Sequence, residues 1–495
     1  MAHARGCRHG LPGCDQLPLP PPSSGCESRW WQGQWSKTTQ ATRLPDRGRC
    51  WWWDVGRATR ATSARYQNNQ SFHQCSDAAD RHAASWEWAA EDDACRMNAS
   101  HAAAALRTVC SRGRSVLLVG DSLTYQVYHA MLRRFFDGRE EDLDTLTCHR
   151  AANCVPLPCG PSGLLPRPSL CMRQSFFFSE APLTLRNRTG GVQATCCAHN
   201  AHGPKATTLP HASDVAGWAE AMRGDAAGSP ATAQGSAVAP AGWVIMNAGT
   251  AHMAGASCES GRKQSWVAHQ VEAHFNRTTS ELATTLASAA PARTKLWWLS
   301  LPSGAAGCGE APTKPLDPDE LGAACSPATK LWGAGTRAEF YCWSRMNRLD
   351  QLGAAAFASV GHGVIAANRP ALLRPDARIA GAESIIVRRA AAHANKSFEP
   401  LAEVMGVPGA RYGDCLHFCL QGVPAFYALA VMRFALLPDE AATPRSPPME
   451  RRPRRYTARV GCAEPEAPKT NKGGKGPHTM ISNARRAAGN FKDKV

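Results

Sequence analysis

From residue 114 onward, short apolar runs alternate with segments whose apolar positions recur at helical spacing. The run at 115–119 is typical of a buried strand, and apolar residues four apart follow it: Leu123, Val127, Met131 and Phe135. The same reasoning predicts further strands at 243–246, 296–301 and 364–367. It also predicts a helix at 423–437 that begins next to Pro424. This alternation predicts an α/β fold, with a mainly parallel sheet covered by helices on both faces.

The alternating pattern defines a domain at 109–440. Within it, 225–242 is rich in Ala, Gly, Ser and Pro, and we expect it to be an inserted loop, as we do for much of 302–336. Residues 1–25 end in a Pro/Ser run and are expected to be a linker. Residues 441–495 are expected to form a basic, disordered tail.

Residues 26–108 are unusually rich in tryptophan and cysteine. The tryptophans are Trp30, Trp31, Trp35, Trp51, Trp52, Trp53, Trp86 and Trp88, and the cysteines among them are Cys26, Cys50, Cys75 and Cys95. This density predicts a loop-rich region that is stapled by disulfides and packs on the larger domain. A surface on which the indole rings stack against sugars is the functional alternative.

The composition excludes several classes of protein. With 495 residues, 43% of them hydrophobic, the chain can bury a sizeable core and is too apolar to be wholly disordered. No stretch approaches the roughly 18 uninterrupted apolar residues of a membrane helix. The net charge is +16, but residues 444–495 carry 13 Lys and Arg against 4 Asp and Glu, so the body is only mildly basic. No aromatic or helical recognition pattern accompanies the charge, and we expect no nucleic-acid partner.

Cysteines and glycosylation sequons favour the secretory pathway, in the Golgi lumen or outside the cell. The chain has 20 cysteines and Asn-x-Ser/Thr sequons at Asn69, Asn98, Asn187, Asn276 and Asn395, a combination typical of an oxidising, glycosylating compartment. The first residues contain no apolar targeting segment. We therefore expect a start codon or an anchor further upstream, and membrane association only through such an anchor.

A metal site can be drawn from two clusters of potential ligands, but their spacings match no four-ligand zinc template. The clusters are Cys148, Cys154 and Cys159, and Cys196 and Cys197 with His199 and His202. We expect no bound metal.

The first candidate for chemistry is Gly120-Asp121-Ser122. A strand that ends in Gly, followed by a helix that starts at Ser, puts the Ser122 hydroxyl at the carboxyl end of the sheet and at the positive end of a helix dipole. That position suits a nucleophile, because nearby backbone N–H groups can hold a developing oxyanion. The structural alternative is that Ser122 is only a helix N-cap and Asp121 a turn former.

The second candidate is Asp414-Cys415-Leu416-His417. An Asp three residues before a His can orient the imidazole, so that its other nitrogen faces a serine hydroxyl. Asp-x-x-His is also common as a purely structural element. The neighbouring Cys415 and Cys419 can pin the loop and fix the pair's position.

The third candidate is Asn247-Ala248-Gly249, directly after a predicted strand. The Asn247 amide can donate a hydrogen bond to an oxyanion, and Gly249 permits close approach of the backbone. Taken alone, Asn-x-Gly is more often a turn. Together and in this order, the three segments supply a nucleophile, an oxyanion donor and an oriented base, which is a complete acyl-transfer site.

This order of motifs resembles that of the SGNH/GDSL hydrolase superfamily. The amino-acid sequences of the individual motifs resemble those of the plant trichome birefringence-like proteins of the PC-esterase group. Gly120-Asp121-Ser122-Leu123 is similar to their GDS block, and the segment at 414–424 to their DCxHWCLPGVP block. Trp86-Glu87-Trp88, followed by Cys95, resembles that family's approach to its first strand. The likeness covers roughly residues 85–437, and the late block is its specific part.

The chain departs from the family's pattern beside each motif. Thr124-Tyr125-Gln126 stands where the family has Ser-Arg-Asn-Gln, and Phe418 and Gln421 stand where it has Trp and Pro. Thr250-Ala251-His252 replaces the usual His-Trp-Trp. These differences leave the triad residues in place and change the surroundings in which the substrate would bind.

The resemblance implies a three-layer α/β/α SGNH-like catalytic domain and an O-acyltransferase, most simply for acetyl groups, acting on hydroxyls of cell-wall or secreted polysaccharide or glycan in the Golgi lumen. Ser122 would be the nucleophile, His417 the base and Asp414 its orienting partner. The oxyanion and substrate would contact Gly120, Asp121, Asn247 and Gly249. No bound cofactor is implied, and the acyl donor would be acetyl-CoA or an acetylated carrier. An acetylesterase of the same fold and a non-catalytic extracellular glycan-binding protein are the alternatives.

Overall fold

The computed structural model describes residues 26, 30–38, 75, 77–137, 154–160, 166–174, 183–186, 189–196, 222, 238–247, 250, 253–254, 265–304, 313–320, 345–379 and 416–437. All of them belong to the first of the two units into which the chain divides, residues 1–441. The expected linker at 1–25 and the expected tail at 441–495 lie wholly outside the described residues. Most of the two expected inserted loops and the sequons at Asn69, Asn187 and Asn395 lie outside them as well.

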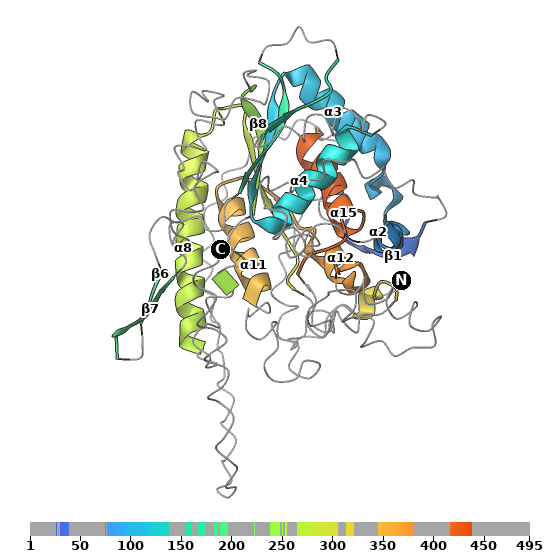
Figure 1. The fold of residues 1–495 in the computed structure, drawn as a ribbon. Coiled ribbons are helices and arrows are strands. Elements are labelled where there is room, and N and C mark those ends of the chain that lie inside the picture. Colours follow the sequence, from blue (N-terminus) through green and yellow to red (C-terminus); the bar gives the residue numbers. More distant parts are fainter. Residues whose placement is uncertain are drawn as a thin grey trace, which may run out of the picture. The chain divides into compact units, whose positions relative to one another are not determined.

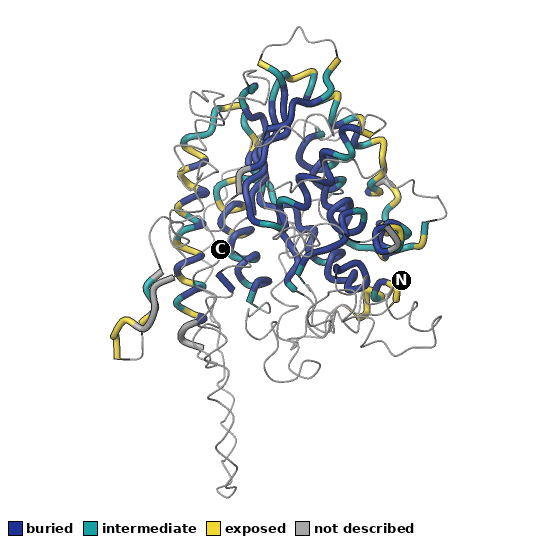
Figure 2. Tube along the Cα trace, in the orientation of Figure 1, coloured by how far each residue is buried: buried dark blue, intermediate teal, exposed yellow. Residues whose placement is uncertain are grey.

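A six-stranded sheet, with strand order β10-β9-β8-β3-β5-β4, forms the core of this unit. Its strands are β3 (Ser115–Gly120), β4 (Cys154–Pro156), β5 (Ser169–Gln174), β8 (Ala241–Asn247), β9 (Lys295–Leu299) and β10 (Gly363–Ile365). All neighbouring pairs are parallel except β4 and β5, which are antiparallel. Every residue of β3 and β8 is buried, as Figure 2 shows for the middle of the sheet.

Helices lie on both sides of the sheet (Figure 1). On one side α8 (Ser265–Ala289) packs against α11 (Met346–Ser359). On the other side α4 (Ser122–Phe135) packs against α3 (Ala99–Arg112) and α15 (Val423–Ala430), which continues into the π-helical segment η11 (Val431–Leu436). The α/β class predicted from the sequence is therefore confirmed.

The predicted strands and helices lie close to those of the structure. The expected strands correspond to β3, β8, β9 and β10, with ends that differ by about two residues, and the expected helices correspond to α4 and to α15 with η11. The sequence pattern does not predict β4 and β5. Shorter elements are α2 (Asp77–Ala84), η3 (Asp93–Cys95), η7 (Pro318–Glu320), α12 (Asn368–Leu372), η9 (Pro375–Ala377) and the hairpin β6 (Leu183–Arg186) with β7 (Val192–Cys196).

Three tryptophans of the N-terminal region, Trp30, Trp35 and Trp88, belong to the hydrophobic core. Strands β1 (Gly33–Lys37) and β2 (Trp86–Ala90) form an antiparallel pair that sets Trp35 opposite Trp88. Trp30 stacks on Phe434, with ring centroids 5.0 Å apart, and Trp35 meets Phe426 edge-on at 5.4 Å. Because Trp30, Trp35 and Trp88 are 2%, 8% and 7% exposed, their rings do not form a sugar-stacking surface. Trp31 and Trp86 are partly exposed, and Trp51 to Trp53 lie outside the described residues.

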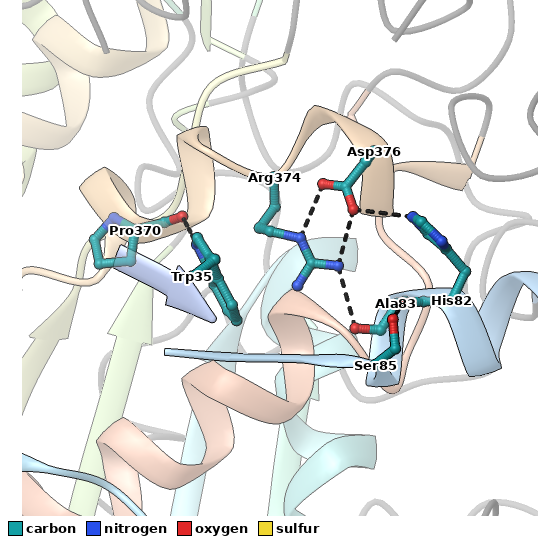
Figure 3. Close-up of polar contacts among 7 residues, drawn as sticks. All are labelled: Trp35, His82, Ala83, Ser85, Pro370, Arg374 and Asp376. Carbon is teal, nitrogen blue, oxygen red and sulfur yellow. Dashed lines mark hydrogen bonds and ion pairs between the residues drawn. The ribbon is translucent and has the colours of Figure 1, made fainter. Parts of the chain in front are cut away.

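A buried ion-pair network also holds the N-terminal region to the α/β unit (Figure 3). Arg374 pairs with Asp376 at 2.9 Å, donates to the carbonyl of Ala83 in α2 at 3.1 Å, and stacks over the Trp35 ring. Asp376 Oδ2 lies 3.1 Å from His82 Nε2. Burial favours the neutral acid, but the charge of Arg374 and the contact with His82 outweigh it and hold the pKa of Asp376 below its ordinary value.

Disulfides join the N-terminal region internally and to the end of the fold. The four pairs among the described residues are Cys26–Cys95, Cys75–Cys419, Cys110–Cys159 and Cys154–Cys171. The expected stapling of the N-terminal region is confirmed for the first two pairs, and Cys75–Cys419 spans 344 residues. Multiple disulfides indicate an oxidising compartment. Among the described residues, no helix is both long and apolar enough to cross a membrane.

Candidate active site

Ser122 lies where the central strand β3 passes into helix α4. Gly120, the last residue of β3, is paired with Asn247 at the end of β8, so the turn sits at the carboxyl edge of the sheet. A side chain on Gly120 would collide with the carbonyl of Asn247 and with Thr124. Glycine is therefore required here by the close approach of two strand ends and the first turn of α4.

Asp121 caps α4, which leaves the neighbouring serine available. Its Oδ1 accepts a hydrogen bond from the Leu123 N–H at 3.0 Å, and its side chain is fully buried. Burial raises the pKa of Asp121 to about 6, while the Leu123 N–H and the charge of His417 act in the opposite direction. The structural alternative, in which Ser122 is the cap, is wrong, because Asp121 fills that role.

Ser122 and His417 lie in contact although 295 residues separate them in the sequence. The distance between Ser122 Oγ and His417 Nε2 is 2.7 Å. His417 is 8% exposed, whereas Ser122 is partly open to solvent. A hydroxyl at hydrogen-bond distance from an imidazole nitrogen, at the start of a helix, has the geometry needed for proton transfer from the hydroxyl.

The other predicted members of the site are placed differently. Asp414, the expected orienting partner of His417, and Gly249 lie outside the described residues, so their roles remain predictions. Asn247 is fully buried, and its amide nitrogen donates to the carbonyl of Leu299 at 2.7 Å and to Asp350 Oδ1 at 3.1 Å. Both amide hydrogens of Asn247 therefore have acceptors, and its role as an oxyanion donor also remains a prediction.

Asp350 of α11 is a buried polar centre that the sequence reasoning missed. Besides Asn247, its carboxylate accepts hydrogen bonds from Trp298 Nε1 at 2.9 Å and from Asn368 Nδ2 at 3.3 Å. Burial raises the pKa of Asp350 to about 7, against the lowering effect of hydrogen bonds from Trp298, Ser300 and Asn247. Because its partners belong to β8, β9 and α12, this one side chain ties together the strand ends beside the candidate site.

Arg378 supports the segment that carries His417, and it was also missed. Its guanidinium donates to the carbonyl of Leu416 at 2.6 Å and to that of Ser303 at 2.5 Å, and it lies over the Phe418 ring. The backbones of Arg378 and Phe418 form an isolated antiparallel bridge, and the Ile379 N–H donates to the His417 carbonyl at 3.1 Å. No local pattern reveals such a role, because its partners are main-chain carbonyls far away in the sequence.

Two of the cysteines considered as metal ligands form disulfides, whereas the side chain of Cys196 lies outside what the structure describes. Cys154 and Cys159 are in disulfides, and a separate cluster of Cys75, Asp80 and Cys419 contains another disulfide, so these sulfurs are not free thiolates. Cys148, Cys197, His199 and His202 lie outside the described residues. The predicted sequon residue Asn276 is exposed on α8, and Asn98 is exposed but caps α3.

Comparison with protein-family models finds no family that matches the chain, and comparison with curated proteins finds no significant match.

Proposed function

We propose that this protein is a polysaccharide O-acyltransferase, most simply an O-acetyltransferase, that works through an acyl-serine intermediate on an SGNH-like fold. The contact between Ser122 Oγ and His417 Nε2 at 2.7 Å carries the proposal. Two residues so distant in sequence meet at the carboxyl edge of a parallel sheet, which is where ligands bind in open α/β folds.

In the first half-reaction, His417 Nε2 accepts the proton of Ser122 as the serine oxygen attacks the carbonyl carbon of an acyl donor. The tetrahedral intermediate places its negative oxygen at the N-terminus of α4, where backbone N–H groups and the helix dipole favour an anion. His417 then gives its proton to the leaving group, and the acyl-serine remains. Asp414 would hold the imidazole in the required tautomer.

In the second half-reaction, a sugar hydroxyl gives its proton to His417 and attacks the acyl-serine carbonyl. The glycan ester leaves, and the proton returns from His417 to Ser122 Oγ. Acetyl-CoA or an acetylated carrier would supply the acyl group, and the glycan acceptor fits a protein of the secretory pathway, in the Golgi lumen or outside the cell. Where water takes the place of the sugar, the same residues make an acetylesterase.

Covalent labelling tests the nucleophile directly. We expect a fluorophosphonate probe to label Ser122 in the wild-type protein and to leave Ser122→Ala unlabelled, whereas the exposed control Ser111→Ala labels as the wild type does. Hydrolysis of p-nitrophenyl acetate is expected to fall roughly 10³-fold or more in Ser122→Ala and in His417→Ala. A wild-type protein that takes up no probe, or a Ser122→Ala protein with full activity, would refute the proposal.

Competition between water and sugars separates the two enzymatic outcomes. With p-nitrophenyl acetate as donor, an acyltransferase is expected to add an acetyl group to members of an oligosaccharide panel, detected by mass spectrometry. Release of free acetate alone, at a rate that the sugars leave unchanged, would identify an esterase.

A further inference from the structure

Gln126 connects the helix of the candidate nucleophile to the segment of the candidate base. It lies four residues after Ser122 on α4, which is about one helical turn, so both side chains share one face of the helix. Its Nε2 donates to the Phe418 carbonyl at 2.7 Å, and the Phe418 N–H donates to its Oε1 at 3.3 Å. Phe418 directly follows His417.

We infer that Gln126 is a positioning residue that sets the distance between Ser122 and His417, an inference that rests on the function proposed above. A single hydrogen bond leaves a backbone segment free to rotate about that bond, whereas two hydrogen bonds from one planar amide, to the N–H and the C=O of the same residue, restrict both the position and the orientation of that residue's backbone. The backbone of Phe418 is thereby held at a fixed offset from α4, and because its N–H belongs to the peptide group that joins it to His417, the backbone of His417 is held with it.

The surroundings of Gln126 make this link stiff. The side chain is 1% exposed, so water does not compete for either hydrogen bond. On the other side of His417, Arg378 holds the Leu416 carbonyl at 2.6 Å. Arg378 ties the base segment to η9, while Gln126 ties it to the helix that begins with the nucleophile. Gln126 therefore acts on the separation of the two reacting groups.

The first test compares Gln126→Leu with Val127→Ala. Gln126→Leu keeps the approximate size and removes both hydrogen bonds, and Val127→Ala removes buried packing from the next residue of the same helix. In folded protein, we expect fluorophosphonate labelling of Ser122 to slow about 10- to 100-fold in Gln126→Leu and by less than about threefold in Val127→Ala. Equal labelling rates in wild type and Gln126→Leu would overturn the inference.

The second test uses Gln126→Glu and a pH profile. A protonated carboxyl has one donor and one acceptor and reproduces both hydrogen bonds of the amide, whereas a carboxylate cannot donate to the Phe418 carbonyl. The labelling rate of Gln126→Glu divided by that of the wild type is therefore expected to rise about tenfold as the pH falls from about 8 to about 5. A ratio that is independent of pH contradicts the inference, and this variant also serves if Gln126→Leu does not fold.

Crystal structures distinguish failure of this inference from failure of the proposed function. We expect the distance between Ser122 Oγ and His417 Nε2 to increase from 2.7 Å to beyond hydrogen-bond range, about 3.5 Å or more, in Gln126→Leu. If this distance increases in Gln126→Leu but the wild-type protein is not labelled by the probe, the enzymatic function is refuted and the positioning role of Gln126 is supported. An unchanged distance would refute the positioning role whatever the activity.

Discussion

Asp121 and Ser122, two adjacent residues at the start of α4, make different contacts. The Asp121 carboxylate satisfies the Leu123 N–H at the helix start, and the Ser122 hydroxyl is left to contact His417. A serine that capped the helix would instead direct its oxygen to the backbone. The polar residue before Ser122 therefore has a local structural role that keeps the serine oxygen facing the imidazole.

A second carboxyl, Asp350, makes stability depend on pH. Its pKa of about 7 is higher than the ordinary value of about 3.9 in an unfolded chain, so the folded protein binds this proton more tightly. Its contribution to the free energy of unfolding is therefore greatest below about pH 4 and declines as the pH rises through about 7.

Asp350→Asn removes the titrating carboxyl, so we expect the free energy of unfolding of this variant to depend less on pH than that of the wild type. Between about pH 4 and about pH 8 it should decline less, whatever the overall loss of stability that the substitution causes. Urea denaturation at a series of pH values measures this difference. Asp317→Asn, which removes an exposed carboxyl, is the control and is expected to follow the wild type. Parallel curves for wild type and Asp350→Asn would contradict the assigned pKa.

At the scale of elements, the segment around His417 depends on anchors from several directions. The disulfide Cys75–Cys419 ties it to the residues before α2, and the Cys419 N–H donates to the Ala377 carbonyl at 2.9 Å. His417 is two residues from that disulfide. The position of the imidazole therefore depends on a covalent link to the N-terminal region.

We expect the double variant Cys75→Ser, Cys419→Ser to lose about 2–5 kcal/mol of stability and also to label more slowly at Ser122. The matched control is Cys154→Ser with Cys171→Ser, which removes the disulfide between β4 and β5. Thermal unfolding measures the loss of stability. The labelling rate of Ser122, measured at a temperature at which both variants are folded, reports the positioning of His417 separately. Equal labelling rates in both double variants would show that the Cys75–Cys419 link does not position His417.

Which elements the sequence predicts depends on where their partners lie. Strands β3, β8, β9 and β10 pair with one another in parallel, and their continuous apolar runs are easily recognised in the sequence. By contrast, β4 is a short antiparallel edge strand that ends in Pro156, and β5 contains Arg173 and Gln174, so neither shows a continuous apolar run. The proximity of Ser122 and His417 follows from the order of the motifs, whereas the contacts of Arg378 and Gln126 with distant backbone groups have no signature in the sequence.

For the whole described unit, the N-terminal region is part of one core with the sheet and its helices. Trp30, Trp35 and Trp88 each contact the ring of Phe426 in α15. Arg374 hydrogen-bonds both to Asp376 of the α/β unit and to the Ala83 carbonyl of the N-terminal region. The composition of this region predicts stapling and packing but not which rings are buried, because burial depends on contacts with α15, which begins only at Val423.

We expect Trp30→Ala to lower the free energy of unfolding by about 3–5 kcal/mol, because it removes a ring packed between two phenylalanines. Trp86→Ala, in the same region but partly exposed, is expected to cost less than half as much. Chemical denaturation of both variants provides the comparison. Equal losses would argue against the N-terminal region sharing the core.

The span of the Cys75–Cys419 bond has a consequence for biosynthesis. Ribosomes deliver the chain from its N-terminus, so the thiol of Cys75 emerges 344 residues before its partner and must stay unpaired, or exchange out of a wrong pairing, until Cys419 has been translated. Production in a host compartment that lacks a thiol–disulfide isomerase is therefore expected to yield mostly mispaired material, however well the individual strands and helices form.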